Sequence, residues 1–149
     1  MERGECGMKY TPMVRKAMEI AYEAHHGQVD KAGVPYIYHP IHLAEQMEDE
    51  TSICVALLHD VLEDTCISEE ELRQKGISSG VIDNIKLLTK GKEEGYMEYL
   101  ERLKSSEIAV KVKIADLKHN SDVSRLLEIT EKDKKRLEKY TEAIKRLTH

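Results

Sequence analysis

The chain has 149 residues, a formal net charge of −5 and 34% charged residues. That length fits one domain with a real core, and an acidic chain of this kind is not expected to bind nucleic acid, which needs a basic face. Neither the first residues nor the longest apolar run, 53–58, resembles a signal peptide or a membrane span. We therefore expect one cytoplasmic domain over residues 1–149, with 1–10 flexible and no membrane or nucleic-acid partner. Its oligomeric state is left open.

The first predicted helix begins at Pro12, and its apolar residues recur at spacings of three and four as far as Ala24. Glycines and prolines then break the periodicity, so residues 27–40 are expected to form a loop. Pro40 suits the first turn of a second helix, because proline is tolerated where the backbone N–H has no helical partner. This assignment places His39 at the N-terminal edge of the second helix.

The second helix is expected to end near Asp49, and Thr51 or Ser52 can cap the third. Residues 53–58 of this third helix are apolar on every side. A helix without a polar face belongs at the centre of a domain. We therefore expect this helix to be surrounded by the others.

The second half of the chain is also predicted to be helical. Ser68 and Glu71 form a capping box for a short helix that Gly76 ends. The alternation in residues 108–114 fits either a strand or a helix, but a lone strand would leave its backbone groups unpaired, so we predict a helix. Further helices are expected at residues 81–88, 96–103 and 131–147. The predicted fold class is all-α, a compact multi-helix bundle.

Four ionisable residues follow the central apolar run: His59, Asp60, Glu63 and Asp64. Burying such groups is costly unless they are paired or bind a metal. Residues four apart share a helical face, so this stretch can offer two metal ligands and, one turn later, two carboxylates for proton transfer. Imidazole and carboxylate together suit Zn, Fe, Mn or Co, and such an ion produces hydroxide near neutral pH. The three cysteines show no CxxC spacing and predict neither a disulfide framework nor a metal site.

Three segments resemble the HD-domain hydrolases, specifically the (p)ppGpp hydrolase branch found in RelA/SpoT-type enzymes and small stand-alone alarmone hydrolases. In the family order, they are AHHGQVDKAGVPYIYHP (24–40), ALLHDVLEDT (56–65) and KIADLKHN (113–120). The resemblance implies an HD-type helical bundle and removal of the 3′-pyrophosphate from a guanosine bis-diphosphate, giving pyrophosphate and GDP or GTP. We see no synthetase or regulatory segment and expect a protein that only degrades alarmones.

The same resemblance assigns roles to individual residues. It implies metal ligation, with Mn²⁺ as the expected ion and another divalent metal as the alternative, by His39, His59, Asp60 and Asp116. Glu63 and Asp64 match the acidic pair that positions and activates the attacking water. Substrate binding is expected at Lys31, Lys113 and Asn120, with Lys118 and Arg125 as weaker candidates for phosphate contacts.

Three positions depart from the family pattern: Asp30, Ala32 and Leu117. At position 30 the family usually has a basic residue that packs against the base, where a guanidinium stacks on an aromatic ring. An aspartate cannot stack in this way and repels nearby phosphates. An HD phosphohydrolase for an adenine alarmone or a nucleoside monophosphate is therefore a second interpretation. A non-catalytic nucleotide-binding module is a third, which the intact Glu63 and Asp64 disfavour.

Supporting, packing or surface roles are expected for several other histidines, tyrosines and cysteines. Supporting or surface positions are expected for His25, His26 and His42, whereas His119 either faces the site or is exposed. Tyr36 and Tyr38 are expected to pack the loop. Cys54 is expected in the core, and Cys66 as an ordinary thiol.

Overall fold

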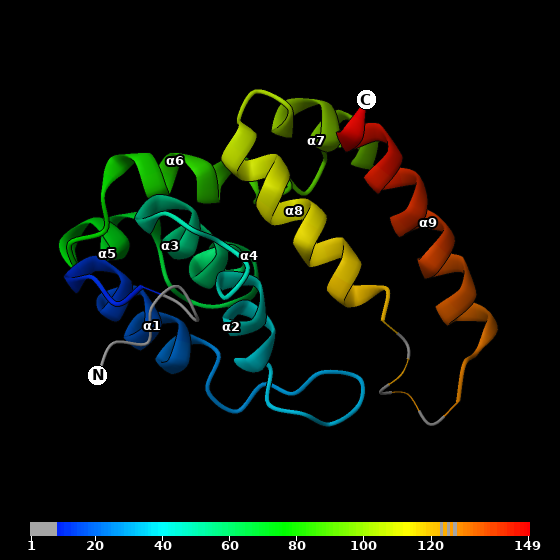
Figure 1. The fold of residues 1–149 in the computed structure, drawn as a ribbon, viewed down its shortest axis with the longest axis horizontal. Coiled ribbons are helices and arrows are strands. Elements are labelled where there is room, and N and C mark those ends of the chain that lie inside the picture. Colours follow the sequence, from blue (N-terminus) through cyan, green and yellow to red (C-terminus); the bar gives the residue numbers. More distant parts are fainter. Residues whose placement is uncertain (1–8, 123, 125, 127) are drawn as a thin grey trace.

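The computed structural model describes residues 9–122, 124, 126 and 128–149, whose regular structure is helical (Figure 1). The helices are α1 (Pro12–Ala24), α2 (Tyr38–Ala44), α3 (Glu50–Leu58), α4 (Val61–Asp64), α5 (Glu69–Gln74), α6 (Ser79–Leu87), α7 (Tyr96–Leu103), α8 (Glu107–Asn120) and α9 (Glu131–Thr148). Over these ranges the backbone forms no strand, only an isolated bridge between Val29 and Pro35. The predicted all-α class is confirmed. Residues 1–8, predicted to be flexible, and Arg125 lie outside the described ranges.

Helix α3 is the centre of the bundle, as its sequence predicts. Every residue from Ser52 to Leu58 is buried, and the helix packs against α1, α2, α6 and α8. Helix α9 lies beside α8 and α7 (Figure 1). Because α3 touches both α2 and α8, residues on these three elements meet although they are far apart in sequence.

Two predicted boundaries around α3 are wrong. Helix α2 ends at Ala44 and does not continue to Asp49. Asp49, and neither Thr51 nor Ser52, caps α3, because its carboxylate accepts hydrogen bonds from the backbone N–H (2.8 Å) and the hydroxyl (2.9 Å) of Ser52. An aspartate at the N-cap satisfies an N–H that has no helical partner and complements the helix dipole.

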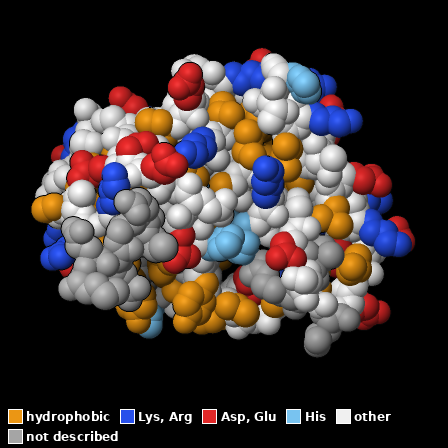
Figure 2. All heavy atoms as spheres, in the orientation of Figure 1, with side chains coloured by type: hydrophobic (Ala, Val, Ile, Leu, Met, Phe, Trp, Pro, Cys, Tyr) orange, Lys and Arg blue, Asp and Glu red, His pale blue; other side chains and the backbone are white. Residues whose placement is uncertain are grey.

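The other predicted helices are present. Ser68 and Glu71 form the capping box of α5, and Gly76 follows it with a φ of 92°, a left-handed conformation that glycine adopts without strain. The ambiguous segment 108–114 lies inside α8. Among the described residues, no helix is both long and apolar enough to cross a bilayer. Acidic and basic side chains are interspersed over the face drawn in Figure 2.

The helical run after Leu58 is interrupted. Helix α3 ends at Leu58, and α4 begins only at Val61, so His59 and Asp60 form a junction and are not part of one continuous helix. The backbone N–H of Asp64 still donates to the carbonyl of Asp60 at 2.9 Å. This junction presents its two side chains at the end of the buried central helix.

Candidate active site

Four of the residues predicted to bind metal come together from three parts of the chain. His39 lies in the first turn of α2, His59 and Asp60 form the junction after α3, and Asp116 lies in α8. His39 Nε2 is 2.8 Å from Asp116 Oδ1, and His59 Nε2 is 3.1 Å from Asp60 Oδ2 and 3.6 Å from Asp116 Oδ1. One ligand atom each of His39, His59 and Asp60 lie within 4.8 Å of one another.

The chemistry of this cluster fits a divalent cation. The ring Nδ1 of His59 donates to the carbonyl of Ala56 at 2.7 Å, while its buried Nε2 faces Asp60 Oδ2 at 3.1 Å without the geometry of a hydrogen bond. The bond to Ala56 selects the tautomer whose Nε2 lone pair is free to bind a metal. Imidazole nitrogens and carboxylate oxygens together form a ligand set that divalent transition-metal ions accept.

The charges in the cluster depend strongly on one another. Burial lowers the pKa of His59, but Asp60 and Asp116 outweigh burial and raise this pKa well above its ordinary value. Burial likewise raises the pKa of Asp116, yet Lys113, His39 and His59 hold it well below the usual range. The carboxylates therefore stabilise positive charge at the position of the two imidazoles, whether a proton or a metal ion supplies it.

Further side chains orient these groups. Asp116 accepts from Lys113 Nζ at 3.1 Å and from Asn120 Nδ2 at 3.0 Å, both on α8. The Nδ1 atoms of His39 and His119 are 2.6 Å apart, with the rings nearly parallel at 17°. His119 therefore faces the site, which the sequence left open.

The loop before α2 also contributes to the site. The Tyr36 hydroxyl donates a hydrogen bond to Asp60. Burial and the nearby Asp60 raise the pKa of Tyr36 far above its ordinary value, so the hydroxyl keeps its proton. Tyr36 thus does more than pack the loop, whereas Tyr38 is exposed. His25 is buried with its ring 4.9 Å from that of Tyr36, and His26 is exposed.

Glu63 and Asp64 lie on α4 beside the cluster. One carboxylate oxygen each of Asp60, Glu63 and Asp64 lie within 4.8 Å of one another. Burial raises the pKa of both Glu63 and Asp64, and the charge of Asp60 adds to the increase. The backbone N–H of Lys90 donates a hydrogen bond to Glu63 Oε1 at 3.0 Å. This bond lowers the pKa of Glu63 and so offsets part of the increase. The acidic pair therefore lies beside Asp60 of the histidine–aspartate cluster, and both side chains are exposed to solvent.

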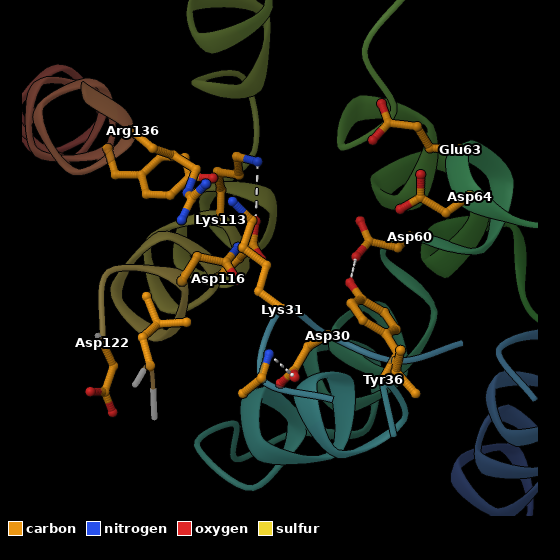
Figure 3. A pocket seen from close by; sticks show the side chains of 15 residues that line it. Asp30, Lys31, Tyr36, Asp60, Glu63, Asp64, Lys113, Asp116, Asp122 and Arg136 are labelled. Atoms are coloured by element: carbon orange, nitrogen blue, oxygen red, sulfur yellow. Dashed lines mark hydrogen bonds and ion pairs between the residues drawn. The ribbon is translucent and has the colours of Figure 1, made fainter. Parts of the chain in front are cut away.

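A cavity of about 420 Å³ opens onto this cluster. Figure 3 shows Asp60, Glu63 and Asp64 on one side of the cavity and Lys31, Lys113 and Arg136 on the other. The three predicted substrate-binding residues line the cavity: Lys31, Lys113 and Asn120. Lys118, a weaker candidate for phosphate contacts, is exposed and does not line the cavity. Of the two cysteines that the structure describes, Cys54 is buried, as predicted, and Cys66 is exposed.

Arg136 and Tyr140 of α9 line the same cavity and were not predicted. Their four-residue spacing places them on one helical face, but in a helix rich in cations that spacing does not single out Arg136. Asp133 connects this helix to the loop, because its Oδ1 lies 2.6 Å from Arg136 Nη2 and 3.8 Å from Lys31 Nζ. Its Oδ2 accepts from the backbone N–H and hydroxyl of Thr130.

Asp30 has a structural task in the loop. Its Oδ1 accepts from the backbone N–H groups of Ala32 (2.8 Å) and Val34 (3.0 Å). The turn that these bonds close includes Gly33, whose φ is 83°. Asp30 therefore folds the loop that carries Lys31, and it also lines the cavity.

Comparison with known proteins identifies the family. The HD domain model matches residues 17–107, more than half of the chain, and the chain belongs to this family. It is 34% identical over 125 residues to the GTP pyrophosphokinase of Myxococcus xanthus, covering 72% of this chain and 16% of the relative. It is also 34% identical over 115 residues to the guanosine-3′,5′-bis(diphosphate) 3′-pyrophosphohydrolase of Haemophilus influenzae, covering 68% and 17%. The chain thus spans less than a fifth of the length of these relatives.

A solved structure matches over nearly the whole chain. It is described as a metazoan ortholog of SpoT that hydrolyzes ppGpp, and it superposes with a TM-score of 0.76 at 22% sequence identity. The match covers 94% of this chain and 88% of that one. At this level of identity the comparison establishes the common fold, which is the all-α HD-domain bundle.

Proposed function

We propose that this protein is a metal-dependent hydrolase that removes the 3′-pyrophosphate from guanosine 3′,5′-bis(diphosphate)-type alarmones, giving pyrophosphate and GDP or GTP. The observation that carries the proposal is the convergence of two histidines and two aspartates beside a pair of carboxylates, in a cavity that Lys31, Lys113 and Arg136 also line. The name of the Haemophilus influenzae relative, a 3′-pyrophosphohydrolase of this compound, supports the choice of substrate.

The metal would be held by His39, His59, Asp60 and Asp116, and we propose Mn²⁺ as the ion. When bound, such an ion lowers the pKa of water and neutralises phosphate charge. A polyanionic substrate needs this neutralisation, because Asp60, Glu63 and Asp64 would otherwise repel it. The hydrogen bonds that His59 donates to the Ala56 carbonyl and that Tyr36 donates to Asp60 fix the side chains of His59 and Asp60 in place.

Glu63 and Asp64 are proposed to orient the attacking water and accept its proton. A carboxylate with a raised pKa is a better proton acceptor than an ordinary one. The pKa of each residue is raised by burial and by the neighbouring carboxylates, while each keeps access to the cavity. Their place beside Asp60 brings them within reach of water at the metal cluster.

The basic side of the cavity is proposed to bind the substrate's phosphates. Lys31 and Arg136 are held near each other by Asp133, and Lys113 lies deeper, beside Asp116. Arginine and lysine bind phosphate oxygens by charge-assisted hydrogen bonds. Asn120 lines the same cavity and presents an amide toward Asp116. A substrate with phosphates at two positions can therefore contact both the metal-binding side of the cavity and the side that carries Lys31, Lys113 and Arg136.

A second candidate substrate is an adenine alarmone or a nucleoside monophosphate, and Asp30 is the observation that favours it. Its carboxylate is committed to the loop backbone and lines the cavity, where the family usually places a stacking cation.

One assay separates these candidates. Purified protein is freed of metal, reloaded with Mn²⁺, Mg²⁺ or Zn²⁺, and incubated with ppGpp, pppGpp, ppApp and a set of nucleoside monophosphates. Pyrophosphate release from the guanosine substrates, absent in Asp60→Ala, is the expected result. Release only from ppApp, or phosphate release from monophosphates, would establish the second candidate. Tight nucleotide binding without turnover would instead indicate a binding module.

A further inference from the structure

The segment after α6 is fastened to α7 by several hydrogen bonds. Arg102 of α7 donates from Nη2 to the carbonyl of Thr89 at 3.1 Å and from Nε to Glu94 Oε2 at 2.8 Å. Its Nη1 also lies 3.4 Å from the carbonyl of Lys86. One guanidinium therefore holds the end of α6 and the loop that follows, with donors in a rigid planar arrangement.

Two further contacts hold the loop on either side of Lys90. Glu94 Oε1 accepts from the backbone N–H of Gly91 at 3.1 Å and from Arg102 Nη2 at 2.9 Å. The buried hydroxyl of Tyr99 donates to the carbonyl of Leu88 at 2.8 Å. The pairing with Arg102 lowers the pKa of Glu94 to about 2, so Glu94 is charged at neutral pH. The backbone groups of Leu88, Thr89 and Gly91 are thus each hydrogen-bonded to a side chain.

This fastened loop presents the backbone N–H of Lys90 to Glu63 Oε1 at 3.0 Å, across 27 positions of sequence. Glu63 is exposed and lies on the single turn of α4, and the Lys90 N–H donates a hydrogen bond to its carboxylate from a distant part of the chain. We propose that Arg102 and Glu94 are positioning residues that fix the carboxylate of Glu63 through the Lys90 N–H. This inference rests on the proposed role of Glu63 as proton acceptor.

The kinetic test uses full-length protein with Mn²⁺ and ppGpp. We expect Arg102→Gln to lower kcat about tenfold while KM stays nearly constant, because a misplaced proton acceptor affects the chemical step. Arg102→Lys keeps the charge beside Glu94 but cannot bridge to Thr89, and it should give an intermediate kcat. The matched control is Arg73→Gln, since Arg73 pairs with Glu69 and Glu70 on the surface of α5. The control should leave kcat unchanged.

A double-mutant cycle tests whether Arg102 acts through Glu63. On a Glu63→Ala background, Arg102→Gln should cause almost no further loss of kcat. A full tenfold additional loss on this background, or an effect confined to KM, would overturn the proposal. Arg102→Gln should leave the Mn²⁺ affinity unchanged on both backgrounds, because Arg102 contacts Glu94, Thr89 and Lys86.

Amide hydrogen exchange tests the same linkage without activity. Exchange at Lys90 should become faster in both Arg102→Gln and Glu63→Ala, while the amides of α1 keep their protection. Unchanged exchange at Lys90 in Arg102→Gln would contradict the positioning role even if the enzyme is active. If wild-type protein hydrolyses none of the nucleotides but Lys90 responds as expected, the proposed function fails and the structural linkage stands.

Discussion

The Nε2 atom of His39 lies 2.8 Å from Oδ1 of Asp116, which joins the first turn of α2 to α8 across 77 positions of sequence. Both side chains are buried. This arrangement does not exist in the unfolded chain, so a metal that binds there would contribute to the free energy of folding.

Asp116→Asn should remove most of the metal affinity. The substitution takes the charge from a group that contacts His39, His59 and Lys113, and leaves the buried Lys113 ammonium unpaired. We expect a destabilisation of about 3 kcal/mol in urea unfolding without metal, as for other broken buried pairs. Calorimetry with Mn²⁺ should show at least a tenfold weaker affinity. Asp83→Asn, on the exposed face of α6, is the control; equal affinity in the two variants would rule out ligation by Asp116.

Glu63→Gln should retain the metal and lose turnover. The amide keeps the size of the side chain and can still accept from Lys90, but it cannot take a proton. We expect kcat to fall by about 10²- to 10⁴-fold, the usual range for a lost general base. Metal content is measured on the same samples. If the variant loses its metal, Glu63 is a ligand and its proposed role is wrong.

Metal affinity should increase with pH. Asp60 and Asp116 raise the pKa of His59 well above its ordinary value, so near neutrality a metal must displace a proton from this ring. Displacing one proton makes the affinity rise up to about tenfold per pH unit below that pKa. Calorimetry in two buffers with different ionisation enthalpies counts the released proton. A pH-independent affinity between pH 6 and 8 would contradict the displacement of a proton from His59.

Lys31→Ala and Arg136→Ala should weaken substrate binding more than chemistry. Each removes one cation from the side of the cavity opposite Glu63 and Asp64. We expect KM to rise about tenfold for each, with a smaller change in kcat and a weaker dependence of KM on salt. Lys132→Ala, an exposed cation on α9 that does not line the cavity, should match wild type. A wild-type KM in both variants would place the phosphates elsewhere.

Leu57→Ala should destabilise the whole domain. Leu57 is fully buried in α3, which packs against four other helices. Truncation of a buried leucine costs about 2–5 kcal/mol. Urea unfolding followed by circular dichroism measures the loss, and saturating Mn²⁺ should recover part of it if the fold is retained. A loss below 1 kcal/mol would mean that α3 is less central to stability than its burial indicates.

The sequence was most informative where local chemistry decides the structure. The capping box of Ser68 and Glu71 and the all-apolar run before His59 correctly predicted a short helix and the central helix. It was least informative at the boundary between α2 and α3. There Asp49 was assigned to the end of one helix although its carboxylate caps the next. An acidic residue suits either interpretation until the backbone conformation is known.

In the candidate site, too, some residues could be predicted from the sequence and others depend on tertiary packing. His39, His59, Asp60 and Asp116 could be grouped from the sequence because the resemblance to a family supplied their common role. Arg136 could not, because its place in the cavity depends on how α9 packs against α8 and on the bond to Asp133. The spacing of Leu137, Tyr140, Ile144 and Leu147 predicts the helix, but it does not show which of the many cations on α9 faces the cavity.

The two oxygens of the Asp133 carboxylate make different contacts. One oxygen closes the capping box that starts α9, and the other faces Lys31 and Arg136. A phosphate bound by these cations would change the charge around the residue that caps α9. If a nucleotide binds as proposed, its binding and the stability of α9 are thermodynamically linked, and each should be measurable through the other.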